Sequence, residues 1–262
     1  MDNPKQLTVL SLCSGYGGLE LGLSRALENP LRVVAVEVEA YALANLVAKA
    51  EEGKLAIEAL YPDLRTFPAE RFRGCFDFVL AGYPCQPFSV AGKRAGTDDP
   101  RHLWPHISRI IEAIQPVFGF FENVPGHLTL GFPEVYRSLR DMGYSVEAGL
   151  FSAKECGLNH DRERLYILAN SKKFSLNELV YAQVREKSKQ EIWEQQFRRQ
   201  NMPIDDSLWC GQEKYVFDTR ICRRNDDGEG PVDRLRLLGN GVVPQQAEKA
   251  FRELMTVLCM RK

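Results

Sequence analysis

The sequence lacks the features of a secreted or membrane-spanning protein. Its seven cysteines are an odd number and include no C-x-x-C pair, which indicates a reducing compartment rather than a disulfide scaffold. No stretch approaches the ~20 apolar residues that a membrane span needs. The first residues, Met1 to Lys5, contain no apolar run of the signal-peptide kind. We therefore expect a soluble, cytoplasmic protein with no membrane partner.

An excess of charge of either sign is also missing. The 34 Lys and Arg residues against 35 Asp and Glu give a formal net charge of -1 and a pI near 6.5, so bulk charge does not indicate a nucleic-acid-binding protein. Any such surface must come from local placement of Lys and Arg. With 262 residues and 44% hydrophobic content, the chain can bury a core for one domain with an insertion, or for one domain and a smaller one.

The most informative stretch is G-Y-P-C-Q-P-F-S, residues 82–89. It follows an apolar run at 76–81 that is typical of a buried parallel strand. The thiol of Cys85 is therefore expected on a tight loop at the carboxyl end of a sheet, where open α/β sheets bind ligands. Pro84 and Pro87 restrict the backbone on both sides of this thiol. A lone buried cysteine is more often a core residue, so the flanking sequence is what favours a functional role.

The amino-terminal part predicts the opening of a nucleotide-binding βαβ unit. A β-rich run at 7–12 leads into the glycine loop C-S-G-Y-G-G at 13–18, and a helix with an apolar face follows. Glycines let the backbone approach a ligand, although this loop is not the G-x-G-x-x-G fingerprint. A second strand at 31–36 ends in Glu37. This acid is placed either to hydrogen-bond ribose hydroxyls or to start the helix expected at 40–50.

A second acidic side chain follows an aromatic-rich run. Residues 117–121 predict a buried strand that ends in E-N-V at 122–124. The apolar surroundings of such a strand raise the pKa of a carboxyl group, because burial disfavours its charged form. Glu122 is therefore suited to carry or share a proton near neutral pH.

Two histidines four residues apart, His102 and His106, begin a helix whose apolar face continues to Ile114. Pro105 stands between them, and no cysteine or carboxylate lies nearby at ligand spacing. We therefore expect no metal site.

The chain then alternates between helix and strand. A helix is expected at 132–142 and strands at 144–151 and 165–169. Just before the last of these strands, Arg162 and Arg164 alternate with their neighbours, so that both side chains would share one face of a strand. The alternative interpretation is a solvated charge ladder on the surface.

Residues 171–230 differ in character from the rest of the chain. Their apolar periodicity weakens, charges of both signs mix, and aromatic residues are scattered among them, which favours a separate small domain inserted late in the chain. After it come a glycine loop at 239–244 and a final helix at 245–259 with an apolar face.

In kind and in order, these motifs resemble those of the cytosine-C5 DNA methyltransferases. The matching residues are Glu37 and Asp63 for the ribose-side and adenine-side acids, Pro84-Cys85 for the nucleophile dipeptide, Glu122-Asn123-Val124 for the E-N-V motif, Arg162 and Arg164 for the Q-x-R-x-R motif, and Asn240 and Val242 for the G-N-x-V motif. His160 stands where that family usually has glutamine. The segment with least resemblance, 171–230, falls where the family has its target-recognition domain.

The resemblance implies an α/β fold of the Rossmann-like, S-adenosylmethionine-dependent methyltransferase type. This is a mostly parallel, doubly wound sheet with one reversed strand, accompanied by a small target-recognition domain. The implied domains are a catalytic domain at 1–170, a target-recognition domain at 171–230 and a return to the catalytic domain at 231–262.

The resemblance also implies S-adenosyl-L-methionine as cofactor, without a metal. The residues implied to bind the cofactor are Cys13, Ser14, Gly15, Tyr16, Gly17, Gly18, Glu37, Val38, Asp63, Leu64, Pro84, Leu103, Asn240 and Val242. Those implied in catalysis are Cys85, Glu122, Arg162 and Arg164, and those implied in substrate binding are Gln86, Ser89, Asn123 and Val124.

The implied reaction is methyl transfer to C5 of a cytosine flipped out of DNA, through a covalent bond between Cys85 and C6, with the loop at 89–101 closing over the base. The implied partners are double-stranded DNA and a restriction endonuclease acting on the same site. The protein would act as a monomer in a prokaryotic or phage-infected cell.

Three other interpretations remain open. A tRNA cytosine-C5 methyltransferase would use the same chemistry, since one branch of the family has that substrate. A nicotinamide-dependent oxidoreductase would share the βαβ opening, but it would need the missing G-x-G-x-x-G and has no use for P-C-Q-P. An inactive DNA-binding relative would be expected to lack Cys85 or Glu122, and both are present.

Overall fold

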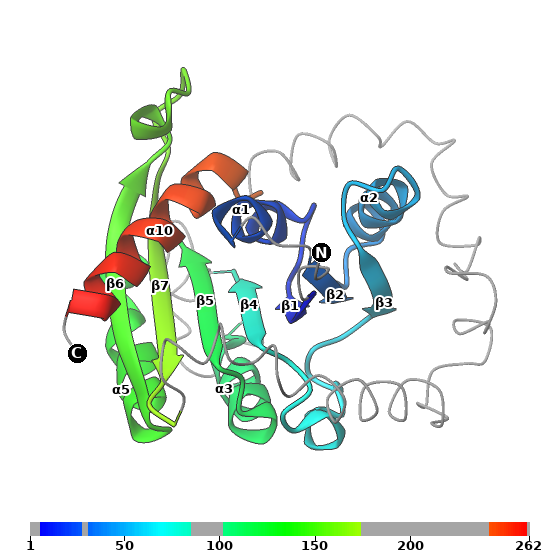
Figure 1. The fold of residues 1–262 in the computed structure, drawn as a ribbon, viewed down its shortest axis with the longest axis horizontal. Helices are drawn as coiled ribbons and strands as arrows, with labels where there is room; N and C mark the ends of the chain where they lie inside the picture. Colours follow the sequence, from blue (N-terminus) through cyan, green and yellow to red (C-terminus); the bar gives the residue numbers. More distant parts are fainter. Residues whose placement is uncertain (1–5, 28–30, 85–101, 174–240, 261–262) are drawn as a thin grey trace, which may run out of the picture.

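A computed structural model of the chain describes residues 6–27, 31–84, 102–173 and 241–260. These residues form a seven-stranded sheet with helices on both faces (Figure 1). The strands are β1 (Leu7–Leu12), β2 (Leu31–Val36), β3 (Ile57–Tyr61), β4 (Phe78–Gly82), β5 (Phe118–Asn123), β6 (Tyr144–Ser152) and β7 (Glu163–Ser171). The α-helices are α1 (Gly18–Leu27), α2 (Ala40–Glu51), α3 (Trp104–Ile114), α4 (His127–Leu130), α5 (Phe132–Asp141) and α10 (Pro244–Met260), and the 3-10 helices are η1 (Ala69–Phe72) and η4 (Lys154–Cys156).

The sheet is doubly wound, with the strand order β3-β2-β1-β4-β5-β7-β6. The neighbours from β3 to β5 pair in parallel, whereas β7 runs antiparallel to both β5 and β6. Strand β7 is reversed because the connection at 153–162 returns the chain beside β6 as a hairpin, and strands joined in this way pair antiparallel. The mostly parallel sheet with one reversed strand confirms the expected fold.

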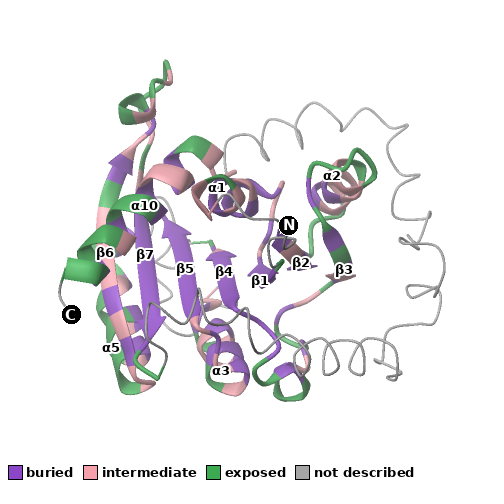
Figure 2. Cartoon of the chain, in the orientation of Figure 1, coloured by how far each residue is buried: buried purple, intermediate pink, exposed green. Residues whose placement is uncertain are grey.

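The core has two layers, one on each face of the sheet. On one face, α1 and α10 bury apolar side chains against β1, β4 and β5, and Phe78, Phe120 and Phe251 meet there. On the other face, α3 and α5 cover the sheet with side chains such as Trp104 and Leu139. The central strands are buried along nearly their whole length (Figure 2), as expected when helices cover both faces.

Three details differ from the sequence-based expectation. Strand β5 extends to Asn123, so Glu122 lies within the strand rather than after it. Strand β7 begins at Glu163, which puts Arg164 inside the strand and leaves Arg162 just before it. The strand at 57–61 was not assigned from the sequence, because its pattern did not distinguish helix from strand.

Strand β7 also runs one residue into the segment expected to form the small domain, because Ser171 pairs with Tyr144. The remainder of that segment lies outside the described residues from position 174 onward, as do the loop that follows Pro84 and the residues up to Asn240. Within the described ranges, no helix is long and apolar enough to cross a membrane.

Candidate active site

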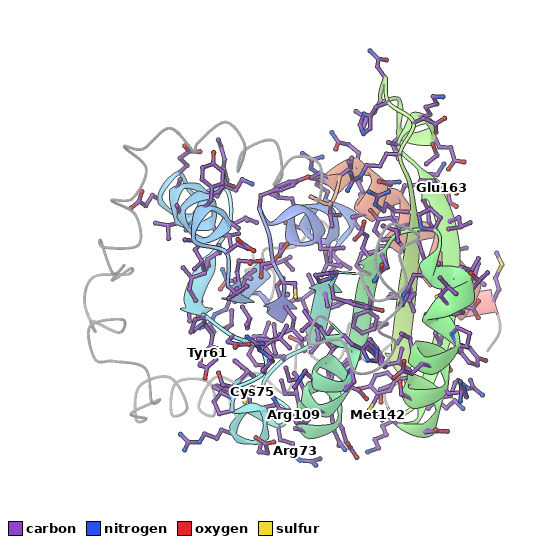
Figure 3. The ribbon with its side chains drawn as sticks, turned by 180° about the vertical axis from the view of Figure 1, so that it is seen from behind. Tyr61, Arg73, Cys75, Arg109, Met142 and Glu163 are labelled. Atoms are coloured by element: carbon purple, nitrogen blue, oxygen red, sulfur yellow. The ribbon has the colours of Figure 1, made fainter. Side chains whose placement is uncertain are left out.

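The reversed strand brings two distant motifs together at one end of the sheet. In the antiparallel pairing of β5 with β7, Glu122 lies opposite Tyr166 and Asn123 lies opposite Leu165. The start of β7 therefore meets the end of β5. Figure 3 shows Glu163 at the end of the sheet where β7 begins, while Arg73 and Cys75 lie at the opposite end.

Glu122 and Arg164 form a nearly buried ion pair at this meeting point. The Nε of Arg164 lies 3.1 Å from Oε1 of Glu122, and the two side chains are only 18% and 8% exposed. Burial raises the pKa of Glu122 from 4.5 to about 7, although the nearby charges of Arg164 and Arg162 act to lower it. The raised pKa expected from the sequence is thus found, and the carboxyl group exchanges its proton near neutral pH.

The two arginines have different partners. Whereas Arg164 pairs with Glu122, the Nη2 of Arg162 donates a hydrogen bond of 2.6 Å to the carbonyl oxygen of Gly241. The neighbouring Val242 carbonyl accepts a hydrogen bond from the hydroxyl of Tyr16. The segment that leads into α10 is therefore held from two sides, by the arginine motif and by the glycine loop.

Asn123 connects the end of β5 to the end of β4. Its side-chain amide donates to the carbonyl oxygen of Tyr83 at 3.1 Å and accepts from the backbone N–H of Val124 at 2.9 Å. The Tyr83 hydroxyl in turn lies 2.9 Å from Nε2 of His127 in the buried interior. These contacts fix the backbone that leads into Pro84, which is itself exposed.

Three expected catalytic or substrate-binding residues, Cys85, Gln86 and Ser89, lie outside the described residues, as does Asn240. Pairing of Gly82 with Glu122 nevertheless brings the strand that precedes them beside the ion pair.

The Glu37 carboxylate accepts hydrogen bonds from the glycine loop and from the backbone of its own segment. Oε2 of Glu37 accepts the N–H of Gly15 at 2.8 Å, and Oε1 accepts the N–H groups of Val38 and Glu39, both at 2.9 Å. The backbone at Gly15 has a φ of +56°, a conformation that glycine adopts without strain. Glu37 thereby links the carboxyl ends of β1 and β2.

Several other expected cofactor residues follow the carboxyl ends of β1 to β3, namely Cys13 and Ser14 after β1, Val38 after β2, and Asp63 and Leu64 after β3. Burial raises the pKa of the Cys13 thiol strongly, and the negative charges of Glu37 and Asp63 raise it further. Arg65 pairs with Asp63 at 2.8 Å and lowers its pKa. Of the remaining residues, the Ser14 hydroxyl donates to the Ser11 carbonyl, Leu64 is buried, Leu103 packs against the core and Val38 is 67% exposed.

Gly18, the last residue of the glycine loop, packs closely against the backbone of Val242. A Cβ at Gly18 would overlap the carbonyl oxygen of Val242. The absence of a side chain at Gly18 therefore lets the 241–242 segment lie directly against the start of α1. Within the described residues, no group of His, Cys, Asp and Glu side chains forms a metal site.

Comparison with known proteins identifies the family. The model of the family described as C-5 cytosine-specific DNA methylase matches residues 7–226, which is most of the chain. The chain belongs to this family.

Related proteins agree with that assignment. The Type II methyltransferase M.NgoMIV of Neisseria gonorrhoeae is 35% identical over 169 residues, which cover 63% of this chain and 52% of the relative. M.HgiBI of Herpetosiphon aurantiacus is 29% identical over 187 residues, 70% of this chain and 41% of the relative. The crystal structure of the S. pombe Dnmt2 methyltransferase is similar with a TM-score of 0.52 at 26% identity, covering 67% of this chain and 55% of that one. The chain spans about half the length of the curated relatives it matches.

Sequence reasoning missed two positions in this chain. Gln246 is fully buried and donates hydrogen bonds to two backbone carbonyls beside the arginine motif. A usable signal was present, because position 246 lies four residues before Ala250, on the apolar face of the final helix. Tyr83 and its contact with His127 had no comparable signal, since the two are far apart in the sequence.

Proposed function

We propose that this protein transfers a methyl group from S-adenosyl-L-methionine to C5 of a cytosine in double-stranded DNA. The observation that carries the proposal is the buried pair of Glu122 and Arg164, beside the strand that leads into Pro84-Cys85, in a chain of this family. A proton donor and a fixed cation are the two groups that a cytosine ring needs when a nucleophile adds to it.

The donor set around the glycine loop fits the cofactor. S-adenosylmethionine offers ribose hydroxyls and an adenine amino group, which are hydrogen-bond donors, and the site provides the carboxylates of Glu37 and Asp63 as acceptors. Glu37 already accepts three backbone N–H groups. A carboxylate has about four acceptor positions, so it keeps roughly one for a ligand. When bound, the cofactor supplies a methyl group on a positively charged sulfur.

Cys85 would make the C5 atom reactive. Addition of its thiolate to C6 breaks the C5=C6 double bond and moves an electron pair into the ring, so that C5 becomes nucleophilic. After methylation, loss of the C5 proton to a base lets the double bond re-form while the thiolate leaves.

Glu122 and Arg164 would stabilise the charge that builds up on the ring. Glu122 has a pKa of about 7, so a large fraction of the carboxyl is protonated at neutral pH and can donate to N3. The guanidinium of Arg164 would lie at O2, with its orientation set by the contact of its Nε with Oε1 of Glu122. Both groups are largely removed from water, where such interactions are strongest.

A cytosine inside a duplex presents neither face to a thiol, so the target base must be flipped out. We assign residues 1–170 and 231–262 to the catalytic domain and 171–230 to target recognition, where side chains read base edges. The Type II relatives favour a role in restriction–modification. We further propose that an endonuclease acts on the same site and that this protein acts as a monomer.

Base-resolution mapping of C5-methylcytosine tests the proposal. The protein is expressed in a host free of DNA methylation, beside a Cys85→Ala control, and genomic DNA and tRNA are both analysed. We expect methylation at one short DNA motif in the active strain alone. Methylation confined to tRNA, methylation in neither nucleic acid, or methylation that persists in Cys85→Ala would each contradict the proposal.

A further inference from the structure

Gln246 has an unusual position for a glutamine. It is 0% exposed, on the first turn of α10, and its carboxamide reaches across the end of the β6–β7 hairpin. Nε2 donates to the carbonyl oxygen of Phe151 at 2.5 Å and to that of Arg162 at 2.9 Å. Its N–H₂ group therefore holds a backbone carbonyl from each side of the hairpin.

The two carbonyls belong to the part of the hairpin that carries the arginines. Phe151 lies opposite Arg164 in the β6–β7 register, and the Arg162 carbonyl also accepts the N–H of Ala153 at 2.9 Å. The backbone of Arg162 and the backbone opposite Arg164 are thus both hydrogen-bonded to the carboxamide of Gln246.

The side chains of the arginines complete the same arrangement. Arg162 donates to Gly241, five residues before Gln246, and Arg164 pairs with Glu122. The carboxamide of Gln246 and the guanidinium of Arg162 therefore connect the 241–246 segment to the part of the hairpin that carries Arg164.

The chemistry of the contact explains the residue type. Two carbonyl oxygens need two donors from one group, which a carboxamide provides and an ionised carboxylate does not. Burial makes the match important, because a buried polar group that loses its partner costs about 1–3 kcal/mol.

We propose that Gln246 is a positioning residue that fixes the orientation of Arg162 and Arg164 toward the reacting base. The inference rests on the proposed function of the Glu122–Arg164 pair. Gln246 itself touches no reacting atom in this scheme and acts through the backbone of the arginine motif.

The test compares Gln246→Met, which keeps the length of the side chain and removes both donors, with Gln246→Asn, which keeps the donors on a shorter stem. Gln245→Leu is the matched control, since Gln245 is the adjacent, exposed glutamine. The first measurement is the pKa of Glu122, read by ¹³C NMR of side-chain-labelled glutamate and assigned by the signal lost in Glu122→Gln. The second is the single-turnover rate of methyl transfer together with the melting temperature.

Among the residues that the structure describes, the charged and titratable groups that interact electrostatically with Glu122 are Arg162, Arg164 and Tyr166 from the β7 side and Tyr16 from the glycine loop. The arginine charges lower its pKa, so we expect that pKa to rise in Gln246→Met and to rise less in Gln246→Asn. A displacement of about 1 Å can cost roughly 100-fold in rate, and we expect a loss of that order in Gln246→Met. Gln245→Leu should match the wild type in both measurements.

An unchanged Glu122 pKa in the folded Gln246 variants would overturn the proposal, as would a rate loss no greater than the loss of folded protein. If Gln246→Met does not fold, Gln246→Asn alone decides the outcome by the same criteria. The pKa measurement needs no methyl transfer. A wild-type protein that transfers no methyl group would therefore refute the proposed function. The pKa of Glu122, compared among wild type, Gln246→Asn and Gln246→Met, would still test the role of Gln246.

Discussion

The Nε of Arg164 lies 3.1 Å from the Oε1 of Glu122, although the two residues come from strands that run in opposite directions. This contact depends on the reversal of β7. A parallel strand in the same place would present its carboxyl end, not its start, to the end of β5. The one antiparallel strand next to β5 is therefore the feature of the fold that builds an acid–cation pair beside the strand leading to Cys85.

The pH dependence of methyl transfer should report Glu122. With a pKa of about 7, the carboxyl loses its proton as the pH rises through neutrality, and donation to N3 is lost with it. We expect the single-turnover rate of the wild type to fall above about pH 7. Glu122→Gln should reduce the rate by roughly 100-fold or more and abolish this falling limb. Glu112→Gln, at an exposed position, should behave like the wild type, and an unchanged pH profile in Glu122→Gln would argue against this assignment.

The same carboxyl should make stability depend on pH. Its pKa in the folded protein is raised from 4.5 to about 7, so between these values the folded state binds more protons than the unfolded state. Stability from this group is therefore fully present below about pH 4.5 and is lost as the pH rises through 7, by roughly 3 kcal/mol. Urea unfolding at pH 5 and pH 8 should show a smaller difference between the two pH values in Glu122→Gln than in the wild type. An equal difference in both proteins would contradict the buried, proton-binding state of Glu122.

The contact between Gly18 and the Val242 carbonyl predicts a sensitive position. A methyl group at Gly18 must displace the backbone at 242, and such overpacking costs about 1–3 kcal/mol. Gly18→Ala should therefore lower the melting temperature. Gly126→Ala serves as the control, because a Cβ there would have no atom within 4 Å and the backbone has a φ of -61°. Equal melting temperatures for the two variants would show that the 241–242 segment does not pack as described.

Glu37 should govern the affinity for S-adenosylmethionine. Replacement by glutamine leaves one acceptor oxygen for the N–H groups of Gly15, Val38 and Glu39, and none for a ribose hydroxyl. We expect calorimetry to give a Kd at least about 10-fold higher for Glu37→Gln, equivalent to about 1.4 kcal/mol. Glu51→Gln, on the exposed end of α2, provides a charge-matched control. An unchanged Kd in Glu37→Gln would remove this residue from the cofactor site.

The regular elements were largely predictable because their sequences carry clear periodicity. The strands at 7–12 and 31–36 and the helix with its apolar face at 247, 250, 251, 254 and 258 agree with the structure. Strand β3 was not predictable from the sequence. Its buried residues Ile57, Ala59 and Tyr61 alternate with one charged and one apolar residue over only five positions. Short apolar segments do not separate helix from strand by pattern alone.

The site was predictable in its residue types and less so in its contacts. The raised pKa of Glu122 follows from an aromatic-rich strand, so the local sequence was sufficient. Arg162 and Arg164 have different partners because Arg162 binds the carbonyl oxygen of Gly241, which lies almost 80 residues later in the sequence, whereas Arg164 pairs with Glu122. No local pattern describes such a contact. The burial of Gln246 could have been inferred from its place on the apolar face of the final helix, but its two partners could not, because they are backbone carbonyls that any sequence would supply.

The most direct test of the central claim is a covalent trap. Duplex DNA of mixed sequence containing 5-fluorocytosine is incubated with the protein and S-adenosylmethionine. Fluorine at C5 cannot leave as the proton does, so the enzyme cannot release itself from the ring. The account predicts a denaturation-resistant complex whose mass equals protein plus DNA plus one methyl group less the hydrogen lost by the thiol, with the DNA attached to Cys85 and no complex in Cys85→Ala. Methylation of the corresponding unmodified DNA without any trapped complex, or a complex attached through another residue, would contradict it.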